Sequence, residues 1–414
     1  MTQPDPGANP APARPAGSGV GSGARPPQGR LNWVDHEGLP QQADWRSLAG
    51  QPAPAQVLVA DETLGPDAAW QLVSAGTGLL WCGSYAQARR LLQQLGTRFD
   101  RQAGGGRPPD AGPSPPPQPA LVAVFQQQRQ VQARRARSLG LLLLPFEVDH
   151  SLALPRAPDV RAAARQARGA VADAYVASLR ELLGLIGAFE WRRKGVPVAS
   201  LQARIHPHHG VFSPVRGEYV DLVAEAPLPA AAWQSGALDI GTGTGVLAAV
   251  LARRGLRVTA TDLSPAALAC AADNLRRLGL GAQVQLQQAD LFPAGARGRA
   301  GLVVCNPPWL PAPAATPLEA AVYDPDSRML RGFLTGLPAR LAPGGEGWLI
   351  LSDLAEHLGL RSRAELLSWI AAAGLQVLDR LVTQPRHGRA SDEADPLHAA
   401  RSAERTSLWR LGLS

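Results

Sequence analysis

The chain has 414 residues, which at roughly 150 residues per domain is enough for two or three domains. Hydrophobic residues make up 45% of it, the formal net charge is +7, and the one lysine is Lys194, a composition typical of a GC-rich bacterial genome and of a mildly basic soluble enzyme. Three widely separated cysteines without CxxC spacing argue against a disulfide framework and a zinc site. The N-terminal residues have no apolar core, so we expect no signal peptide, and the longest apolar run, LGLLLLPF at 139–146, is too short for a membrane span.

The first 200 residues predict an N-terminal mixed α/β and helical part. Residues 1–30, rich in Pro, Gly and Ala, predict a disordered tail. Residues 31–102 predict a small α/β region, with a strand at AQVLVAD and an amphipathic helix around SYAQARRLLQQLGTRF. Residues 103–119 predict a Pro/Gly-rich linker. Residues 120–200 predict a helical region with a basic helix, FQQQRQVQARRARSLG, and a longer helix, AVADAYVASLRELLGLIGAFEW.

Residues 201–414 alternate strand and helix, which predicts an α/β fold with a parallel sheet and helical crossovers. Ser264 predicts a helix N-cap, and Ser362 with Glu365 predicts a capping box. The last two strands have no helical pattern between them, so we expect an antiparallel hairpin at one edge of the sheet. The predicted strands are 237–241, 256–262, 282–290, 301–306, 347–353, 375–382 and 406–411.

A glycine-rich turn, LDIGTGTG, joins the first of these strands to a helix. Glycine lets the backbone bend sharply and lets a ligand approach where a Cβ would collide. Gly241, Gly243 and Gly245 have GxGxG spacing, unlike the GxGxxG of dinucleotide dehydrogenases, which disfavours a nicotinamide-dependent oxidoreductase.

Acidic residues mark three successive strands, and parallel strands bring them to one rim of the sheet, where such folds bind ligands. Asp262 is placed to accept from ribose hydroxyls, Asp290 to meet an adenine amino group, and Asp239 to reach the amino-acid end of a cofactor. The plainer alternative is that Asp262 and Asp290 only cap loops. The predicted cofactor-binding residues are Asp239, Gly241, Thr242, Gly243, Gly245, Asp262, Leu263, Asp290, Leu291 and Asn306.

The fourth strand ends in Asn306-Pro307-Pro308-Trp309, the predicted catalytic residues. The prolines fix the backbone and remove N–H donors, so the Asn306 side-chain oxygen and the Pro307 carbonyl can both accept from one planar –NH2 group. Trp309 can stack on a planar substrate. Methyl transfer to such a nitrogen depends on positioning and electrostatics rather than on a strong base. A proline-rich strand exit is the plainer reading.

With these motifs, residues 201–414 resemble the class I S-adenosylmethionine-dependent methyltransferases, in the N-methyltransferase branch that carries NPP followed by Tyr, Phe or Trp. The resemblance implies a Rossmann-like seven-stranded sheet and S-adenosyl-L-methionine as cofactor. The chain is similar to HemK-type release-factor glutamine methyltransferases through NPPW and an imperfect echo at 323–334. It is similar to small-subunit ribosomal RNA guanine methyltransferases through GVFS at 210–213. Trp309 departs from the tyrosine or phenylalanine of both subfamilies.

This resemblance implies Phe212, Glu218 and Trp309 as substrate contacts and favours methylation of a protein glutamine. An RNA base, or another nucleic-acid base, is the alternative substrate, and a non-catalytic nucleic-acid or partner-binding module is the alternative from another class. We expect a cytoplasmic monomer with a macromolecular substrate, no metal and no membrane. The resemblance does not cover the first 200 residues.

Four further features have plainer interpretations. HPHH at 206–209 predicts a surface loop or a substrate-contact segment rather than a metal site. Side chains alternate along a strand, so Cys305 points to the other face of the sheet from Asn306, and we expect it to lie in the core. The loop 384–404 has mixed charge and borders the expected substrate entrance. The arginines of the basic helix could bind phosphates, but a solvated helix face is the expected interpretation for Arg129, Arg134, Arg135 and Arg137.

Overall fold

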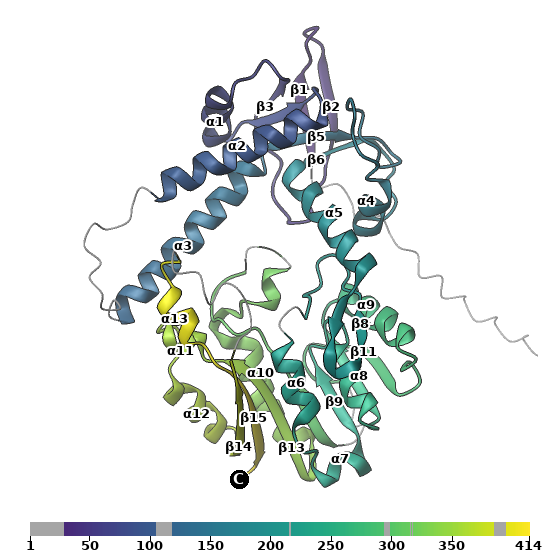
Figure 1. The fold of residues 1–414 in the computed structure, drawn as a ribbon, viewed down its shortest axis with the longest axis vertical. Coiled ribbons are helices and arrows are strands. Elements are labelled where there is room, and N and C mark those ends of the chain that lie inside the picture. Colours follow the sequence, from purple (N-terminus) through teal and green to yellow (C-terminus); the bar gives the residue numbers. More distant parts are fainter. Residues whose placement is uncertain are drawn as a thin grey trace, which may run out of the picture.

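Two large sheets organise the chain in a computed structural model, one within residues 30–178 and the other within 237–413 (Figure 1). Most of the expected tail, most of the expected linker and much of the loop 384–404 lie outside the described residues, while the last residue of the expected tail, Arg30, begins a strand. No helix in the described part is long and apolar enough to cross a membrane. The structure describes residues 29–104, 118–214, 217–293, 299–314, 316, 318–384 and 395–414.

The N-terminal sheet, as far as it is described, consists of β1 (Arg30–Val34), β2 (Pro40–Trp45), β3 (Val57–Ala60), β4 (Gly78–Trp81), β5 (Leu142–Phe146) and β6 (Tyr175–Ser178). The strands lie in the order β1-β2-β6-β5-β4-β3. β3, β4 and β5 are parallel neighbours, β5 and β6 are antiparallel, and β1 with β2 is an antiparallel hairpin. The strand predicted at AQVLVAD is confirmed as β3.

The expectation of a helical region over 120–200 is wrong at three places, because this stretch supplies β5, β6 and a third short strand at Val196–Val198. β5 and β6 are short, buried runs, LLLPF and YVAS. Periodicity alone cannot distinguish a buried strand of this length from a turn of buried helix. The two strands complete the sheet begun by β1–β4, so residues on either side of the expected linker share one core.

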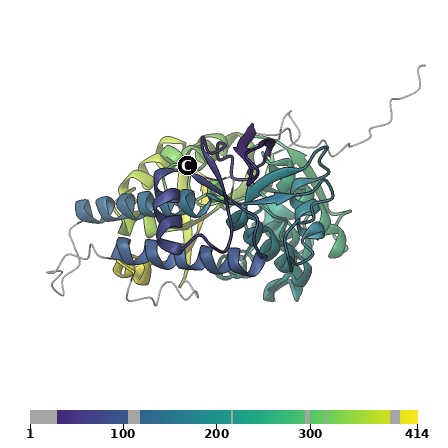
Figure 2. The ribbon, with the colours of Figure 1, turned by 90° about the horizontal axis from the view of Figure 1, so that it is seen from above.

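The described helices of this half are α1 (Pro66–Ala75), α2 (Tyr85–Gly104), α3 (Gln118–Leu139), α4 (Arg161–Arg168) and α5 (Leu179–Lys194). The predicted amphipathic and basic helices are confirmed as α2 and α3. These two pack against each other, and Arg135 of α3 donates to both carboxylate oxygens of Asp100 on α2, at 2.8 and 3.1 Å. Figures 1 and 2 show that α3 runs beyond the N-terminal sheet and reaches the C-terminal half.

A small antiparallel pair, β7 (Val196–Val198) and β8 (Ala203–Ile205), follows α5 and leads into the C-terminal half, with the 3-10 turn η1 (Ala199–Leu201) between its strands. Val198 and Ile205 are buried in the core of the C-terminal sheet. The connection between the halves is therefore packed, which limits how far they can move apart.

The C-terminal sheet is seven-stranded in the described chain, with β9 (Ala237–Ile240), β10 (Val258–Asp262), β11 (Val284–Gln288), β12 (Ala300–Cys305), β13 (Leu341–Ser352), β14 (Leu375–Thr383) and β15 (Thr406–Leu413). The order is β11-β10-β9-β12-β13-β15-β14. The first five in this order are parallel, and β15 pairs antiparallel with both β13 and β14. All seven predicted strands and the edge hairpin are confirmed, in a Rossmann-like sheet.

The described helices of this half are α6 (Glu218–Glu225), α7 (Ala230–Ser235), α8 (Val246–Arg253), α9 (Pro265–Arg277), α10 (Arg328–Gly336), α11 (Leu354–His357), α12 (Arg363–Ala372) and α13 (His398–Ala403), with 3-10 turns η2 (Glu319–Ala321), η3 (Pro325–Ser327) and η4 (Pro338–Arg340). Apolar side chains of α6 and α8 pack on one face of the sheet, and those of α10 and α12 on the other. Cys305 is fully buried on the second face, as predicted.

Local signals placed two helix starts correctly. The Ser264 hydroxyl accepts from the N–H of Ala267 at 3.3 Å, and Ser362 and Glu365 form the predicted capping box. The absence of a helix from the loop 384–404 was a wrong expectation, because α13 lies there. Its six residues are too few for a periodic pattern, and the helix is held by packing, with Ala400 buried against residues of α3 and α11.

Candidate active site

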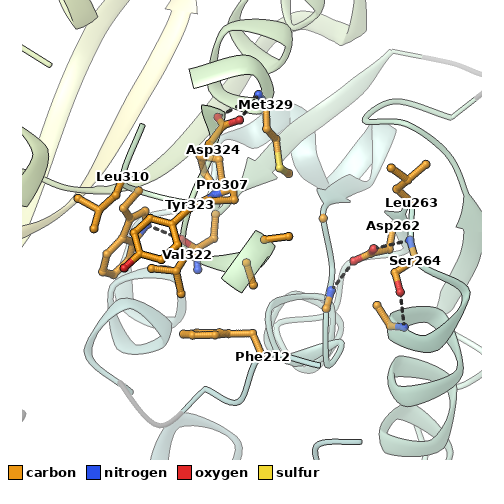
Figure 3. A pocket seen from close by; sticks show the side chains of 18 of the residues that line it. Phe212, Asp262, Leu263, Ser264, Pro307, Leu310, Val322, Tyr323, Asp324 and Met329 are labelled. Atoms are coloured by element: carbon orange, nitrogen blue, oxygen red, sulfur yellow. Dashed lines mark hydrogen bonds between the residues drawn. The ribbon is translucent and has the colours of Figure 1, made fainter. Parts of the chain in front are cut away.

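A cavity of about 1040 Å³ opens where β9, β10 and β12 end, at the carboxyl rim of the parallel sheet. The glycine turn, two of the predicted acids and all of NPPW line it. Figure 3 shows Asp262 and Leu263 at one end of the cavity and Pro307, Leu310 and Tyr323 at the other. Segments that are distant in sequence therefore face one space.

The glycine turn requires its glycines. Gly241, Gly243 and Gly245 have φ of +73°, +55° and +80°, in the left-handed region that side chains with a Cβ rarely adopt. A Cβ on Gly241 would lie 2.6 Å from Met329 Cε, and one on Gly245 would lie 3.1 Å from the Cβ of Ala271. The turn leads directly into the N-terminus of α8, where a helix dipole favours negative charge.

Asp239 is buried behind this turn, at 1% exposure, rather than on the cavity surface. Its Oδ2 accepts from the Thr242 hydroxyl at 2.6 Å and from the Ala248 N–H at 3.0 Å, so one oxygen ties strand, turn and helix together. Its Oδ1 is buried with no hydrogen-bond partner in the described chain. Burial, and secondarily the Asp262 charge, raise the pKa of the Asp239 carboxyl from 3.8 to about 6.

Asp262 ends β10 and lines the cavity. One carboxylate oxygen accepts from the Gly243 N–H at 2.9 Å and the other from the Ser264 N–H at 2.9 Å. Each oxygen keeps a further lone pair, so capping the loop does not prevent ligand binding. Leu263 beside it is 60% exposed and adds apolar surface to the cavity.

Asp290 and Leu291 lie just beyond β11, and both line the cavity. Asp290 pairs with Arg328 of α10 at 2.6 Å. Leu291 has φ of +68°, and its carbonyl accepts from the Thr261 hydroxyl at 2.6 Å. Arg328 was not foreseen, because nothing in the local sequence indicates a partner 38 residues away.

The NPPW turn contains a hydrogen bond that sequence reasoning missed. The Trp309 indole Nε1–H donates to Asn306 Oδ1 at 2.9 Å. Trp309 is half-buried and packs against the cores on both faces of the sheet. An amide oxygen has two lone pairs, so Asn306 Oδ1 retains one acceptor site beside Trp309. The three-residue spacing within a turn is the signal that could have revealed this bond.

The predicted substrate contacts separate into two groups. Phe212 lines the cavity and is 37% exposed, with Gly210 and Val211 beside it. Glu218 is 4% exposed at the start of α6 and does not line the cavity, and its Oε1 has no hydrogen-bond partner among the described residues. The next residue, Tyr219, lines the cavity instead, and burial raises the pKa of its hydroxyl.

The HPHH segment connects the two halves of the molecule. His206 Nδ1 lies 2.6 Å from the carbonyl oxygen of Arg192 on α5, and His208 Nε2 lies 3.3 Å from the Asp273 carboxylate on α9. Burial lowers the pKa of His208 and of His209. The segment is thus an internal contact rather than a surface loop. Over the described ranges, no cluster of His, Cys, Asp and Glu could hold a metal ion.

Part of the cavity wall comes from elements that the sequence did not connect with the site. These elements are α3, α11 with the residue after it, and the end of α13. Hydrophobic periodicity indicates that such helices bury a face, but it does not indicate against what. The residues concerned are Phe125, Gln132, Leu354, Leu358, Arg401 and Glu404.

The solvated face expected for the basic helix is only partly present. Arg134 and Arg137 of α3 are exposed. Arg135 is paired with Asp100, and Arg129 is paired with Glu319 at 3.4 Å, so the charges of both arginines are already partly neutralised by carboxylates rather than available for phosphate binding.

Comparison with known proteins finds similarity in the C-terminal half. Residues 202–359 match the family model of the methyltransferase small domain. The release factor glutamine methyltransferase of Cereibacter sphaeroides is 36% identical over 165 residues, which cover 35% of this chain and 58% of that protein. The ribosomal RNA small subunit methyltransferase C of Alcanivorax borkumensis is 33% identical over 113 residues, covering 27% and 31%. The structure of ribosomal protein L11 methylase from Lactobacillus delbrueckii subsp. bulgaricus is similar with 19% identity and a TM-score of 0.35, over 53% of this chain and 90% of that one.

The similarity is confined to part of each protein. The chain spans 58% of the length of the Cereibacter relative and 31% of the Alcanivorax one. The N-terminal sheet lies outside the family match.

Proposed function

Because residues 202–359 match the family model of the methyltransferase small domain, we propose that this protein is an S-adenosylmethionine-dependent N-methyltransferase that acts on the side-chain amide of a protein glutamine. One observation carries the proposal: the GTGTG turn with Asp262 and the NPPW turn open into the same cavity. A methyl donor and a planar nitrogen can therefore meet there.

The residues at the glycine end suit this cofactor. Left-handed glycines leave room for a ligand against the backbone, and Asp262 offers lone pairs to ribose hydroxyls. Asp239 does not line the cavity, so its part under this proposal is to hold the glycine turn in place through the Thr242 hydroxyl and the Ala248 N–H. Asp290 lines the same cavity, where its carboxylate, paired with Arg328, can also accept from an adenine amino group.

The residues at the NPPW end suit a planar –NH2 group. Asn306 Oδ1 and the Pro307 carbonyl are acceptors, and neither proline offers a competing N–H. When bound, S-adenosylmethionine supplies an electrophilic methyl group, so that the C–S bond breaks with its electron pair left on sulfur, the nitrogen lone pair forms the C–N bond, and the nitrogen then releases a proton. The chain's own part is to hold the nitrogen in line and to exclude water.

Glutamine is favoured as the substrate because several relatives carry the name release factor glutamine methyltransferase. An RNA base is the second candidate. It is supported by Phe212, which exposes an aromatic ring in the cavity from the GVFS segment, and by the relative named ribosomal RNA small subunit methyltransferase C. Aromatic rings of this kind stack on unpaired bases.

Transfer of tritium from methyl-labelled S-adenosylmethionine to bacterial extract tests the proposal. We expect label that survives nuclease and is lost on protease treatment, and mass spectrometry should place it on a glutamine. Asn306→Ala is the matched variant, because it removes one acceptor while leaving the glycine end unchanged. Its transfer should fall to background, while its affinity for S-adenosylhomocysteine, measured by calorimetry, stays close to the wild type.

Label that is lost with nuclease would overturn the glutamine assignment in favour of an RNA base. If S-adenosylhomocysteine binds but no label is transferred to any fraction, the protein is a binding module and the proposed activity is wrong. Full turnover by Asn306→Ala would contradict the role given to that amide.

A further inference from the structure

The N-terminal half contributes directly to the cavity through α3. Leu121 and Phe125 of this helix are 8% and 5% exposed, in a cluster with Leu310 and Leu354 of the C-terminal half. Phe125 also lines the cavity. In Figure 1, α3 descends from the upper sheet to α13, and Gln128 of α3 donates to Asp395, just before α13, at 3.4 Å. The site is thus incomplete without a helix from outside the methyltransferase domain.

One side chain on this helix, Arg129, contacts the stretches that follow NPPW, 310–314 and 318–323, which we call the motif extension. Arg129 Nη2 donates to the Pro313 carbonyl at 2.6 Å and lies 3.4 Å from the Glu319 carboxylate. Its guanidinium carbon lies 3.6 Å from the centroid of the Tyr323 ring, over which it stacks. The Arg129 side chain is 20% exposed. A planar, multiply donating guanidinium can satisfy all three partners at once, which an ammonium cannot.

The motif extension connects the NPPW turn with the start of α10. Leu310, next to Trp309, accepts from the Asp324 N–H at 2.8 Å, and its own N–H donates to the Val322 carbonyl at 3.2 Å. Asp324 is buried, and its carboxylate accepts from the N–H groups of Met329 and Leu330 at the start of α10. Figure 3 shows Leu310, Val322, Tyr323 and Asp324 together beside the catalytic turn.

We propose that Arg129 is a positioning residue for methyl transfer: it holds the motif extension against α3, and so sets where Trp309 and the substrate wall lie. This inference rests on the proposed function. Because Arg129 touches neither the glycine turn nor the acids beside it, its loss should change substrate handling and leave cofactor binding intact. Reacting groups displaced by about 1 Å can lose about a hundredfold in rate, so even partial release of this segment is measurable.

The test compares Arg129→Ala with Arg134→Ala in the full-length protein. Arg134 lies on the same helix with an exposed side chain, so it controls for loss of charge and of helix-forming residues. We expect Arg129→Ala to lower kcat/KM for the labelled macromolecule by at least about tenfold, with S-adenosylhomocysteine affinity within about threefold of the wild type. Arg134→Ala should match the wild type in both. Arg129→Lys should remain impaired, because lysine keeps the positive charge but lacks the planar guanidinium with its several N–H donors.

A second readout does not depend on turnover. Hydrogen exchange followed by mass spectrometry should show faster exchange of peptides covering 318–330 in Arg129→Ala and not in Arg134→Ala. Equal exchange and equal kcat/KM in the two variants would overturn the inference, as would a parallel loss of cofactor affinity and melting temperature in Arg129→Ala. If the wild type transfers no methyl group, the proposed function fails, and the exchange experiment still decides whether Arg129 holds the motif extension.

Discussion

Replacing Trp309 by phenylalanine tests whether the indole does more than offer a flat surface. The variant keeps an aromatic ring beside the substrate but removes the donor that lies 2.9 Å from Asn306 Oδ1. A neutral hydrogen bond contributes about 0.5–1.5 kcal/mol net, which is roughly a 2- to 13-fold bias towards the bonded orientation of the Asn306 amide. Substrate binding and the transition state both need the bonded orientation of the Asn306 amide. We therefore expect kcat/KM to fall by roughly this factor, with S-adenosylhomocysteine affinity unchanged.

The assay is steady-state transfer of labelled methyl groups, with cofactor affinity measured by calorimetry. Trp369→Phe is the control, since Trp369 is also half-buried and packs against the core on the α10 and α12 face, while it does not line the cavity. It should lose stability without losing activity. A Trp309→Phe variant with undiminished kcat/KM would refute the claim that the indole orients Asn306, and Trp309 would then be only a surface for stacking.

Two further predictions concern the glycine end of the site. Burial raises the pKa of the Asp239 carboxyl to about 6, so the folded state disfavours its charged form. This lowers the free energy of unfolding above pH 6, and the loss is relieved as the pH falls towards 3.8. Relative to Asp239→Asn, the wild type should gain on the order of 2–3 kcal/mol between pH 7 and 4 in urea unfolding, and parallel curves would contradict this. Gly241→Ala should weaken S-adenosylhomocysteine binding at least about tenfold, because φ is +73°, where a residue with a Cβ is strained, and because the Met329 methyl group, 2.6 Å from the new Cβ, must shift within the cavity. Gly184→Ala, which meets no atom within 4 Å, should bind normally, and equal affinities would show that the turn tolerates a side chain.

Most of the C-terminal sheet was predictable because its signals are local. A strand such as ALDI is followed at once by glycines that can only be a turn, and Ser362 with Glu365 closes its own capping box. Parallel connection through helices then places Asp262 and Asn306 on the same rim without knowledge of their contacts. The location of the cavity follows from topology alone.

The parts that were missed depend on contacts between distant residues. β5 is an apolar run that reads equally well as buried helix, and its identity as a strand is decided by β4 and β6 on either side. In the sequence, Arg129 is one of several cations on a basic helix. Its contact with the ring of Tyr323, 194 positions further along the chain, is visible only in the structure. Such pairings are set by how the two halves pack, about which a single sequence carries no periodic signal.

The bond between Trp309 and Asn306 sharpens what the catalytic turn can do. The amide oxygen of Asn306 has two acceptor sites, and the indole occupies one of them. Under the proposed function, the other site accepts one N–H of a substrate –NH2 group, and the second N–H, which diverges from the first, is received by the Pro307 carbonyl. Each acceptor thus has one assigned hydrogen, and the two contacts together orient the substrate nitrogen. A tryptophan in place of tyrosine or phenylalanine therefore alters how the turn is held, and it leaves the acceptor chemistry that defines the substrate nitrogen in place.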